Sequence, residues 1–222
     1  MSRFGIIGMG KMGQAITSIL SNENNTEFYT FNRISADNEL QLKTCDVVIE
    51  FTTSEAAPNI IKQCIENGIT VVSGSTGWHE HHLNSIIKLC QLNGGKFLYA
   101  SNFSIGMNIT FALNRKLATI MNDYPKFKVF IKEIHHIHKK DSPSGTAHTL
   151  IEDIIEQHAG YTNFILNPTE TEDENLLLVQ AIREGEVKGF HEVNWQSDSE
   201  KITLSHEAFD RKIFAEGAIM AA

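Results

Sequence analysis

The chain has 222 residues, 41% of them hydrophobic and 21% charged, which is typical of a soluble globular protein with one large domain or two small ones. The formal net charge of −8 argues against nucleic acid as the main partner, and no apolar run is long enough to span a membrane. The three cysteines form no CxxC pair, so we expect reduced thiols in a cytoplasmic protein with no signal peptide.

Short apolar runs alternate with helical patterns over the first hundred residues. We expect strands at 3–7, 27–31, 46–51, 69–73 and 96–100, and helices running to about residue 20, at about 54–67 and at 80–92. Strands and helices that alternate at this spacing indicate βαβ units and a parallel sheet.

The pattern changes after about residue 104. We expect a helix at 106–121, a strand at 127–135, a helix at 144–158, and then strands near 176–183, 188–196 and 200–207. Successive strands without helices between them indicate a mixed or antiparallel sheet. Residues 209–222 have a helical pattern that can return to the first lobe. The chain is therefore predicted to be an α/β protein of two lobes, 1–104 plus about 209–222, and 105–208.

Three glycines at the N-terminus fit the pattern G-x-G-x-x-G between a strand and a helix: Gly8, Gly10 and Gly13, with Lys11 and Met12 between the last two. Such glycines permit a tight turn and let a pyrophosphate approach the N-terminus of the helix. This context favours dinucleotide binding over a purely structural glycine turn.

The second strand lacks the acidic residue that an NAD-specific site would place at its end. Asn32 and Arg33 occupy that position, and Arg33 with Lys11 can instead meet the 2′-phosphate of NADPH. The pattern therefore favours NADPH over NADH. The alternative is that Arg33 is an ordinary solvated surface charge.

Two further loops follow predicted strands and are expected in the same crevice, because ligands of parallel sheets bind at the carboxyl ends of the strands. The first, after the fourth strand, contains Gly74, Ser75 and Thr76, and small residues there can come close to a nicotinamide. The second, after the fifth strand, contains Ser101, Asn102 and Phe103. An ordinary turn is the alternative for the first loop.

The segment 133–147 reads E-I-H-H-I-H-K-K-D-S-P-S-G-T-A and places three histidines and two lysines within six residues. Ser144 is a good N-cap for the helix that follows, and a helix N-terminus attracts anions. Imidazole and ammonium groups can also give a proton near neutral pH. The segment therefore predicts a binding site for a small molecule with several carboxylates, together with a proton source.

A metal site is the alternative interpretation of His135, His136 and His138. Neighbours on a strand point to opposite faces, and no ligand other than Asp141 lies at a standard zinc spacing. We therefore expect no metal.

At these motifs the sequence resembles the 4-hydroxy-tetrahydrodipicolinate reductase (dihydrodipicolinate reductase) family over nearly its whole length. The resemblance lies in the glycine turn, in D-V-V-I-E-F-T ending at Thr52 and including Phe51, in G-S-T-G from Gly74, in S-N-F-S-I-G from Ser101, and above all in H-H-x-x-K-x-D-x-P-S-G-T-A from His135. The segments R-x-G-x-V-x-G-x-H (183–191) and S-H-E-A (205–208) with Arg211 resemble the later strands of the family.

The resemblance implies an N-terminal Rossmann-type domain that binds NADPH or NADH, and a C-terminal α+β domain for substrate binding and oligomerisation as a homotetramer. The implied reaction belongs to the diaminopimelate–lysine pathway: a hydride goes to C4 of a cyclic dicarboxylate, with loss of water. His135 matches the catalytic histidine and Lys139 the proton donor. The implied contacts with the substrate carboxylates come from His136, Ser144, Gly145 and Thr146. The implied cofactor contacts come from the three glycine-motif positions and the loops above, including Phe51.

Three other functions stay open from the sequence. These are a different two-domain NAD(P)-dependent enzyme such as an aspartate dehydrogenase, a nicotinamide-binding module without turnover, and a metal-dependent hydrolase. The cradle at 143–147 disfavours the first, and the intact His135 and Lys139 disfavour the second.

Overall fold

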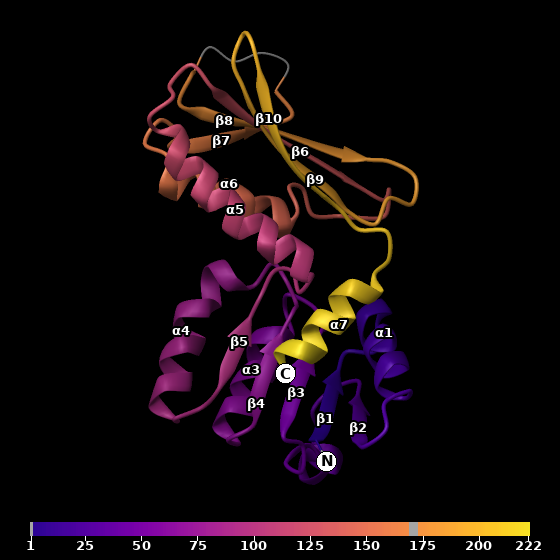
Figure 1. Cartoon of the computed structure of the whole chain (residues 1–222). Helices are drawn as coiled ribbons and strands as arrows, with labels where there is room; N and C mark the ends of the chain where they lie inside the picture. The colour runs from indigo at the N-terminus through magenta and orange to yellow at the C-terminus, as the bar shows by residue number, and fades with distance from the viewer. Residues whose placement is uncertain (1, 169–172) are drawn as a thin grey trace. The chain divides into compact units, whose positions relative to one another are not determined.

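The computed structural model describes residues 2–168 and 173–222, without the side chains of residues 36 and 37. It divides into two compact units, which are drawn in Figure 1. The first, called the cofactor unit below, contains Met1–Ser104 and Arg211–Ala222. The second, called the substrate unit, contains Ile105–Asp210. Among the described residues, no helix is long and apolar enough to cross a membrane.

The cofactor unit is built on a parallel five-stranded sheet with the order β2-β1-β3-β4-β5. Its strands are β1 (Ser2–Ile7), β2 (Thr26–Phe31), β3 (Val47–Glu50), β4 (Thr70–Ser73) and β5 (Phe97–Tyr99). Its helices are α1 (Lys11–Leu20), α2 (Ala36–Leu42), α3 (Ala57–Glu66), α4 (His79–Leu92) and α7 (Lys212–Ala221).

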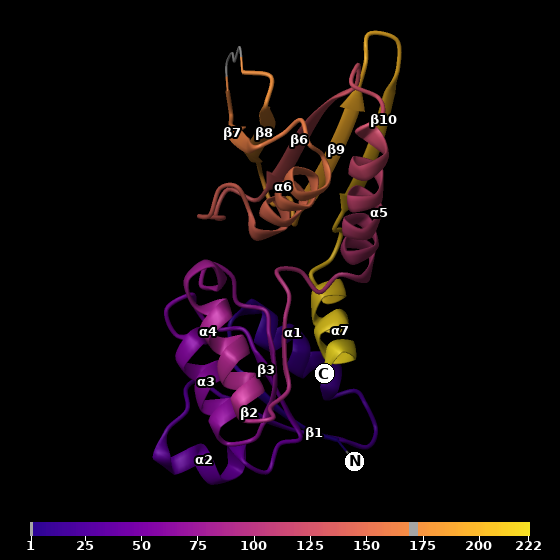
Figure 2. The same ribbon diagram turned by 90° about the vertical axis from the view of Figure 1, so that its left-hand side faces the viewer.

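Helices cover both faces of this sheet, which explains why its strands read as apolar runs (Figure 2). On one face Val48 and Val71 pack against α3 side chains such as Ile61. On the other face Ile49 packs in a cluster with Ile16 of α1 and with residues of α7. The C-terminal helix α7 thus belongs to the cofactor unit, although it follows the substrate unit in the chain.

The substrate unit contains a mixed sheet with the order β10-β9-β6-β8-β7, in which β6 pairs in parallel with β8 and antiparallel with β9. Its strands are β6 (Lys128–His135), β7 (Asn163–Leu166), β8 (Leu176–Arg183), β9 (Phe190–Gln196) and β10 (Lys201–Glu207). Its helices are α5 (Ile105–Met121) and α6 (Gly145–Gln157), and they share one apolar core with the sheet.

The parallel N-terminal sheet and the mixed C-terminal sheet confirm the predicted fold class. Two elements were not predicted. Helix α2 has only seven residues and few apolar ones, and it begins at a capping box between Ser35 and Asn38. Strand β7 has four residues at the edge of the sheet, too short to show a periodicity of its own.

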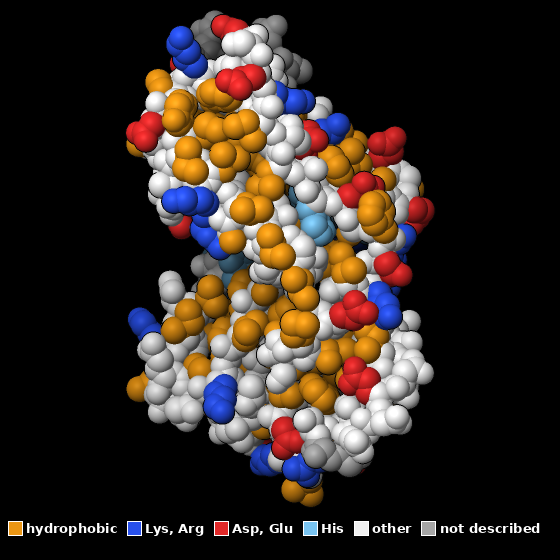
Figure 3. All heavy atoms as spheres, in the orientation of Figure 1, with side chains coloured by type: hydrophobic (Ala, Val, Ile, Leu, Met, Phe, Trp, Pro, Cys, Tyr) orange, Lys and Arg blue, Asp and Glu red, His pale blue; other side chains and the backbone are white. Residues whose placement is uncertain are grey.

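Apolar side chains also lie on the outside of the substrate unit. Figure 3 shows hydrophobic side chains gathered over α5, where Ile105, Ile109 and Leu113 are each more than half exposed. These residues are four apart, so they form a stripe along one side of the helix.

Candidate active site

The turn between β1 and α1 contains three glycines, and a larger residue would have a different effect at each position. Gly8 has a φ of +96°, and a Cβ there would lie 2.1 Å from the carbonyl oxygen of Phe51. A Cβ on Gly13 would lie 2.1 Å from the carbonyl oxygen of Gly8, whereas a Cβ on Gly10 would have nothing within 4 Å. Gly10 is the N-cap of α1. The turn therefore has the tight bend, the open approach and the close packing that a pyrophosphate-binding turn needs.

The order of the cofactor-unit sheet reverses between β1 and β3, and the loops after these strands are neighbours. The Phe51 N–H donates to the Ile7 carbonyl at 2.9 Å, which fixes the backbone beside the glycine turn. A Cβ on Gly74 would lie 2.2 Å from the Phe51 ring, and that ring meets Phe103 edge-on at 5.9 Å. The structure thus brings the ends of β1, β3 and β4 and the Phe103 segment to one edge, the position at which open α/β sheets bind ligands.

A buried carboxylate that the sequence reasoning missed, Glu50, fixes two of these loops. Its Oε1 accepts from the Thr52 N–H and the Ser75 hydroxyl, each at 2.6 Å, and its Oε2 accepts from the Ser73 hydroxyl at 2.6 Å. Because Glu50 is fully buried, water cannot replace these bonds. The backbone from Gly74 to Thr76 is therefore firmly placed. The available signal was a carboxylate that ends an otherwise apolar strand.

The side chains expected to choose the cofactor lie at the end of β2. Asn32 and Arg33 are exposed, and the Arg33 carbonyl accepts from the Asn38 amide at 2.8 Å. Lys11 is exposed at the start of α1, while Met12 packs against the apolar core beneath that helix. Ser101 and Asn102 follow β5 at the same edge of the sheet, and the Asn102 side chain accepts from the Ser104 N–H.

In the substrate unit, β6 carries His135 as its last residue. Alternate residues of β6 are buried, so His135 shares the helix-covered face of the sheet with Ile131 and Glu133, and it is 7% exposed. His136 lies beyond the strand and is half-buried. His138 is exposed and contacts the exposed Glu186. The three histidines therefore do not share one face.

The segment after β6 leads to the helix start that the sequence predicted. Ser144 is the N-cap of α6, and its hydroxyl accepts from the Ala147 N–H at 3.1 Å, which confirms the predicted cap. Gly145 and Thr146 form the first turn, where a helix presents backbone N–H groups and partial positive charge. The Lys139 ammonium is 2.9 Å from the Asp141 carboxylate, and the lysine side chain is only 22% exposed.

Sheet register adds three residues to this site that the sequence reasoning did not assign to it. Glu133 lies directly opposite His191 on β9, and His135 lies opposite Arg183 on β8. Glu133 Oε2 is 3.5 Å from His135 Nδ1 and 3.6 Å from His191 Nε2. Both terminal nitrogens of Arg183 donate to Glu133 Oε1 at 3.2 Å. The Ser144 hydroxyl lies 3.3 Å from His191 Nε2, which ties the helix cap to the same cluster.

The charge states follow from burial and these neighbours. Burial and then the adjacent His191 ring lower the pKa of His135 to about 3, although Glu133 acts in the opposite direction. Burial alone would raise the pKa of Glu133, but contacts from the His191 and Ser144 side chains outweigh it and lower that pKa to about 2. At neutral pH the cluster therefore contains a neutral His135 imidazole beside an ionised Glu133.

These shifts predict that the protein loses stability in acid. A histidine with a lowered folded-state pKa binds its proton in the unfolded chain first, so the free energy of unfolding falls as pH drops from about 6.5 toward 3. Replacing His135 by Gln should remove up to about 1.4 kcal/mol per pH unit from that slope. Urea unfolding at pH 7.5, 6.0 and 5.0 measures this pH dependence of the free energy of unfolding. The matched control is His82→Gln, at an exposed position. A slope in H135Q equal to that of the unaltered protein would contradict the assignment.

Glu133, His135 and His191 also form a group that could hold a metal ion, with ligand atoms within 4.8 Å of one another. It is a different set from the three histidines weighed in the sequence. The Arg183 guanidinium already pairs with the Glu133 carboxylate. A metal ion bound there would lie next to this positive charge, and like charges repel.

Comparisons with known proteins agree with this arrangement. Two family models match consecutive parts of the chain: dihydrodipicolinate reductase, N-terminus, over residues 2–103, and dihydrodipicolinate reductase, C-terminus, over residues 106–222. The chain is 38% identical to the 4-hydroxy-tetrahydrodipicolinate reductase of Christiangramia forsetii, over 98% of this chain and 89% of that protein. It is 34% identical to that of Rickettsia rickettsii, over 100% and 92%.

A solved structure has the same fold. Dihydrodipicolinate reductase from Paenisporosarcina sp. TG-14, with dipicolinate bound, matches with a TM-score of 0.72 over 99% of this chain and 92% of that one. Its sequence identity is 23%, so this likeness concerns the fold alone.

Proposed function

The chain belongs to the dihydrodipicolinate reductase family, and from that premise we propose how its two units divide the chemistry. Its activity is the NAD(P)H-dependent reduction of 4-hydroxy-tetrahydrodipicolinate, a step of lysine and diaminopimelate biosynthesis. Family membership favours this activity over the aspartate dehydrogenase, the binding module and the metal-dependent hydrolase. The three cysteines are free thiols, which fits an enzyme of the reducing cytoplasm.

The cofactor unit is proposed to hold NAD(P)H along the carboxyl edge of its sheet. The glycine turn and the N-terminus of α1 would receive the pyrophosphate, and the open position of Gly10 supports this assignment. The Gly74–Thr76 loop and the segment from Ser101 to Phe103 would line the nicotinamide end. When bound, the cofactor supplies the hydride.

The substrate unit is proposed to bind the dicarboxylate and to supply the proton. The first turn of α6, with Gly145 and Thr146, would receive one carboxylate, and His136 would contact the substrate from the neighbouring segment. Hydride addition leaves negative charge that a positioned acid must neutralise. The Lys139 side chain is held by Asp141 and offers N–H donors, so we assign proton donation to it.

His135 is neutral in the enzyme without substrate, so we assign it a role different from that of Lys139. A bound dianion favours the protonated imidazole, so substrate binding raises the pKa of His135 from its low value. His135 can then donate a hydrogen bond or a proton to the substrate only while it is bound. The observation that carries the proposed mechanism is this combination of a cation-rich cluster and a helix N-terminus within one unit.

The activity is tested by following the loss of reduced-nicotinamide absorbance while the substrate is generated from pyruvate and aspartate semialdehyde. Oxidation must depend on both coupling substrates. Folded protein that binds nicotinamide but oxidises it under no condition would contradict the activity.

The same assay tests the choice between NADPH and NADH. We propose that the enzyme favours NADPH because of Arg33. Its side chain is exposed after β2, where the sequence has Asn32 and Arg33 in place of the acidic residue that would receive the ribose hydroxyls. Arg33→Ala should raise the KM for NADPH about tenfold, equivalent to ~1.4 kcal/mol, and leave the KM for NADH nearly unchanged. Arg3→Ala, at the start of β1, is the control. Equal effects on both cofactors would show that Arg33 does not read the 2′-phosphate.

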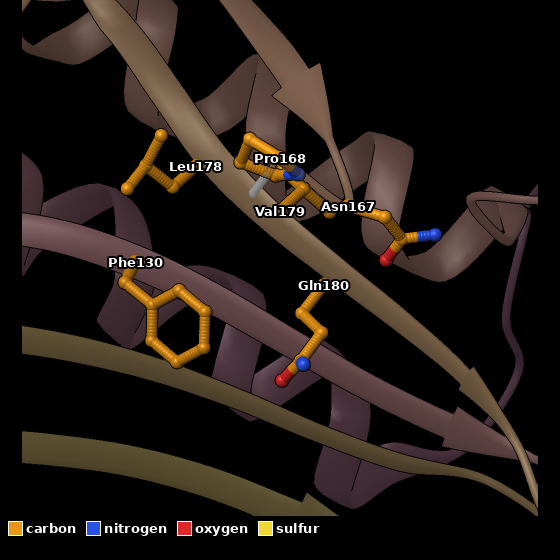
Figure 4. Close-up of a pocket in the computed structure, with 6 residues that line it drawn as sticks. All are labelled: Phe130, Asn167, Pro168, Leu178, Val179 and Gln180. Atoms are coloured by element: carbon orange, nitrogen blue, oxygen red, sulfur yellow. The ribbon is translucent and has the colours of Figure 1, made fainter. Parts of the chain in front are cut away.

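We also propose a homotetramer assembled through the substrate-unit sheet. Within the described part of this unit, both helices belong to the core on one face of the sheet, and the other face carries half-buried apolar residues. Phe130 and Leu178 are cross-strand partners on that face and border a hollow with Pro168 and Gln180 (Figure 4). Accessible apolar side chains on one face of a sheet are characteristic of an interface between subunits. Light scattering of the purified protein gives the mass that tests this assembly.

A further inference from the structure

We propose that Glu133, acting through Arg183, is the positioning residue that places Lys139 and the N-terminus of α6 for the reaction. This inference deepens the proposed function and rests on it. No role follows for Glu133 from the sequence motif, where it is only the first residue before two histidines. Its role follows from the atoms that its carboxylate contacts.

Glu133 is fully buried and is the common partner of residues from three other chain segments. Arg183 contacts its carboxylate from β8, and His191 does so from β9. The Ser144 N–H, in the turn before α6, lies 3.2 Å from each carboxylate oxygen. His135 follows it on the same face of β6. A displacement of this buried carboxylate would break its hydrogen bonds with Arg183 and with the Ser144 N–H, and burial makes the loss of such bonds costly.

Arg183 transmits this position to the segment that carries the proton donor. Besides Glu133, its guanidinium donates to the carbonyl of Lys139 at 3.4 Å and to the carbonyl of Asp141 at 2.5 Å. Lys139 and Asp141 also pair through their side chains at 2.9 Å. The planar guanidinium of Arg183 thus holds the backbone on both sides of residue 140. The flexible side chain of a lysine at position 183 could not make the same set of contacts.

The same contacts orient the two buried imidazoles. The Glu133 carboxylate faces Nδ1 of His135 and Nε2 of His191, so it favours a proton on each of these atoms. His135 Nε2 then faces the side where Gly189 has no side chain, since a Cβ on Gly189 would lie 3.4 Å from it. Glu133 therefore sets which nitrogen of His135 is presented to a ligand.

The test combines three variants with a control in the same unit. Glu133→Gln keeps the shape of the side chain and removes its charge, and Arg183→Lys keeps the charge and removes the planar fork. Each should lower kcat by about 10²-fold, the usual effect of a misplaced catalytic group, with the dissociation constant for NAD(P)H unchanged. The double variant should lose little more than either single one, because the two residues act as one unit. Glu174→Gln breaks the exposed ion pair with Lys128 and should change nothing.

A second readout does not depend on turnover. Nitrogen-15 shifts of labelled histidine should show His135 with its proton on Nδ1 in the unaltered protein and a changed tautomer ratio in E133Q. If E133Q does not fold, R183K carries the kinetic test. Full kcat in folded R183K, or the same His135 tautomer in folded E133Q, would overturn the inference. An inactive but folded unaltered protein that shows the Nδ1 tautomer would instead contradict the proposed function.

Discussion

Replacing Lys139 by alanine is expected to lower kcat by about 10²–10⁴-fold, the usual contribution of a positioned general acid. The ammonium is the proton donor in the proposed mechanism, so its removal leaves the charge that hydride addition creates without a positioned acid. The dissociation constant for NAD(P)H should stay within about twofold, because the residues proposed to hold the cofactor belong to the other unit. Stopped-flow kinetics and fluorescence titration of the cofactor measure the two quantities.

Two further variants make the result specific. Lys139→Arg keeps a cation beside Asp141 but offers a group that does not deprotonate in proteins, so it should not restore kcat. Lys126→Ala, at an exposed position before β6, should leave the kinetics unchanged. A loss of NAD(P)H affinity in K139A as large as the loss in kcat would place this lysine in the cofactor site and contradict the assignment.

The parts of the fold that could be predicted from the sequence are those with local signals. The strand–glycine–helix start, the buried strand ending at Glu50 and the change to successive strands after residue 104 each have a periodicity or a turn chemistry of their own. Helix α2 and strand β7 lack such a signal, because both are too short to complete a periodic pattern.

The candidate site also has residues that a local sequence motif reveals and residues that it does not. His135, Lys139 and Ser144 lie within ten residues of one another, so the motif groups them without any knowledge of the sheet. Arg183 and His191 lie about fifty residues further on, and only the pairing of β6 with β8 and β9 brings them to Glu133. Parallel pairing has no hairpin that would reveal its register. One clue was available: Glu133 has the same parity along β6 as the buried Ile131, and a carboxylate at a core position needs a charged partner.

Substituting alanine at two glycines of the N-terminal turn should separate folding from cofactor binding. At Gly13 a methyl group would meet the Gly8 carbonyl, which belongs to the backbone and cannot rotate away. We expect Gly13→Ala to destabilise the cofactor unit by about 3 kcal/mol, the upper part of the range for overpacked sites. Urea unfolding measures this, and the loss of NAD(P)H binding should follow from the distorted turn.

Gly10→Ala is expected to behave in the opposite way. Nothing lies within 4 Å of a Cβ at this position, and its backbone angles, φ −72° and ψ −163°, suit alanine. The free energy of unfolding should therefore change by less than about 1 kcal/mol, mostly through the weaker N-cap. The methyl group would instead stand where the pyrophosphate approaches α1, and NAD(P)H should bind at least about tenfold more weakly, equivalent to ~1.4 kcal/mol. Unchanged affinity in G10A would place the pyrophosphate elsewhere, and unchanged stability in G13A would mean that α1 does not pack so closely on the turn. With both expected results, the second glycine serves the ligand and the third serves the fold.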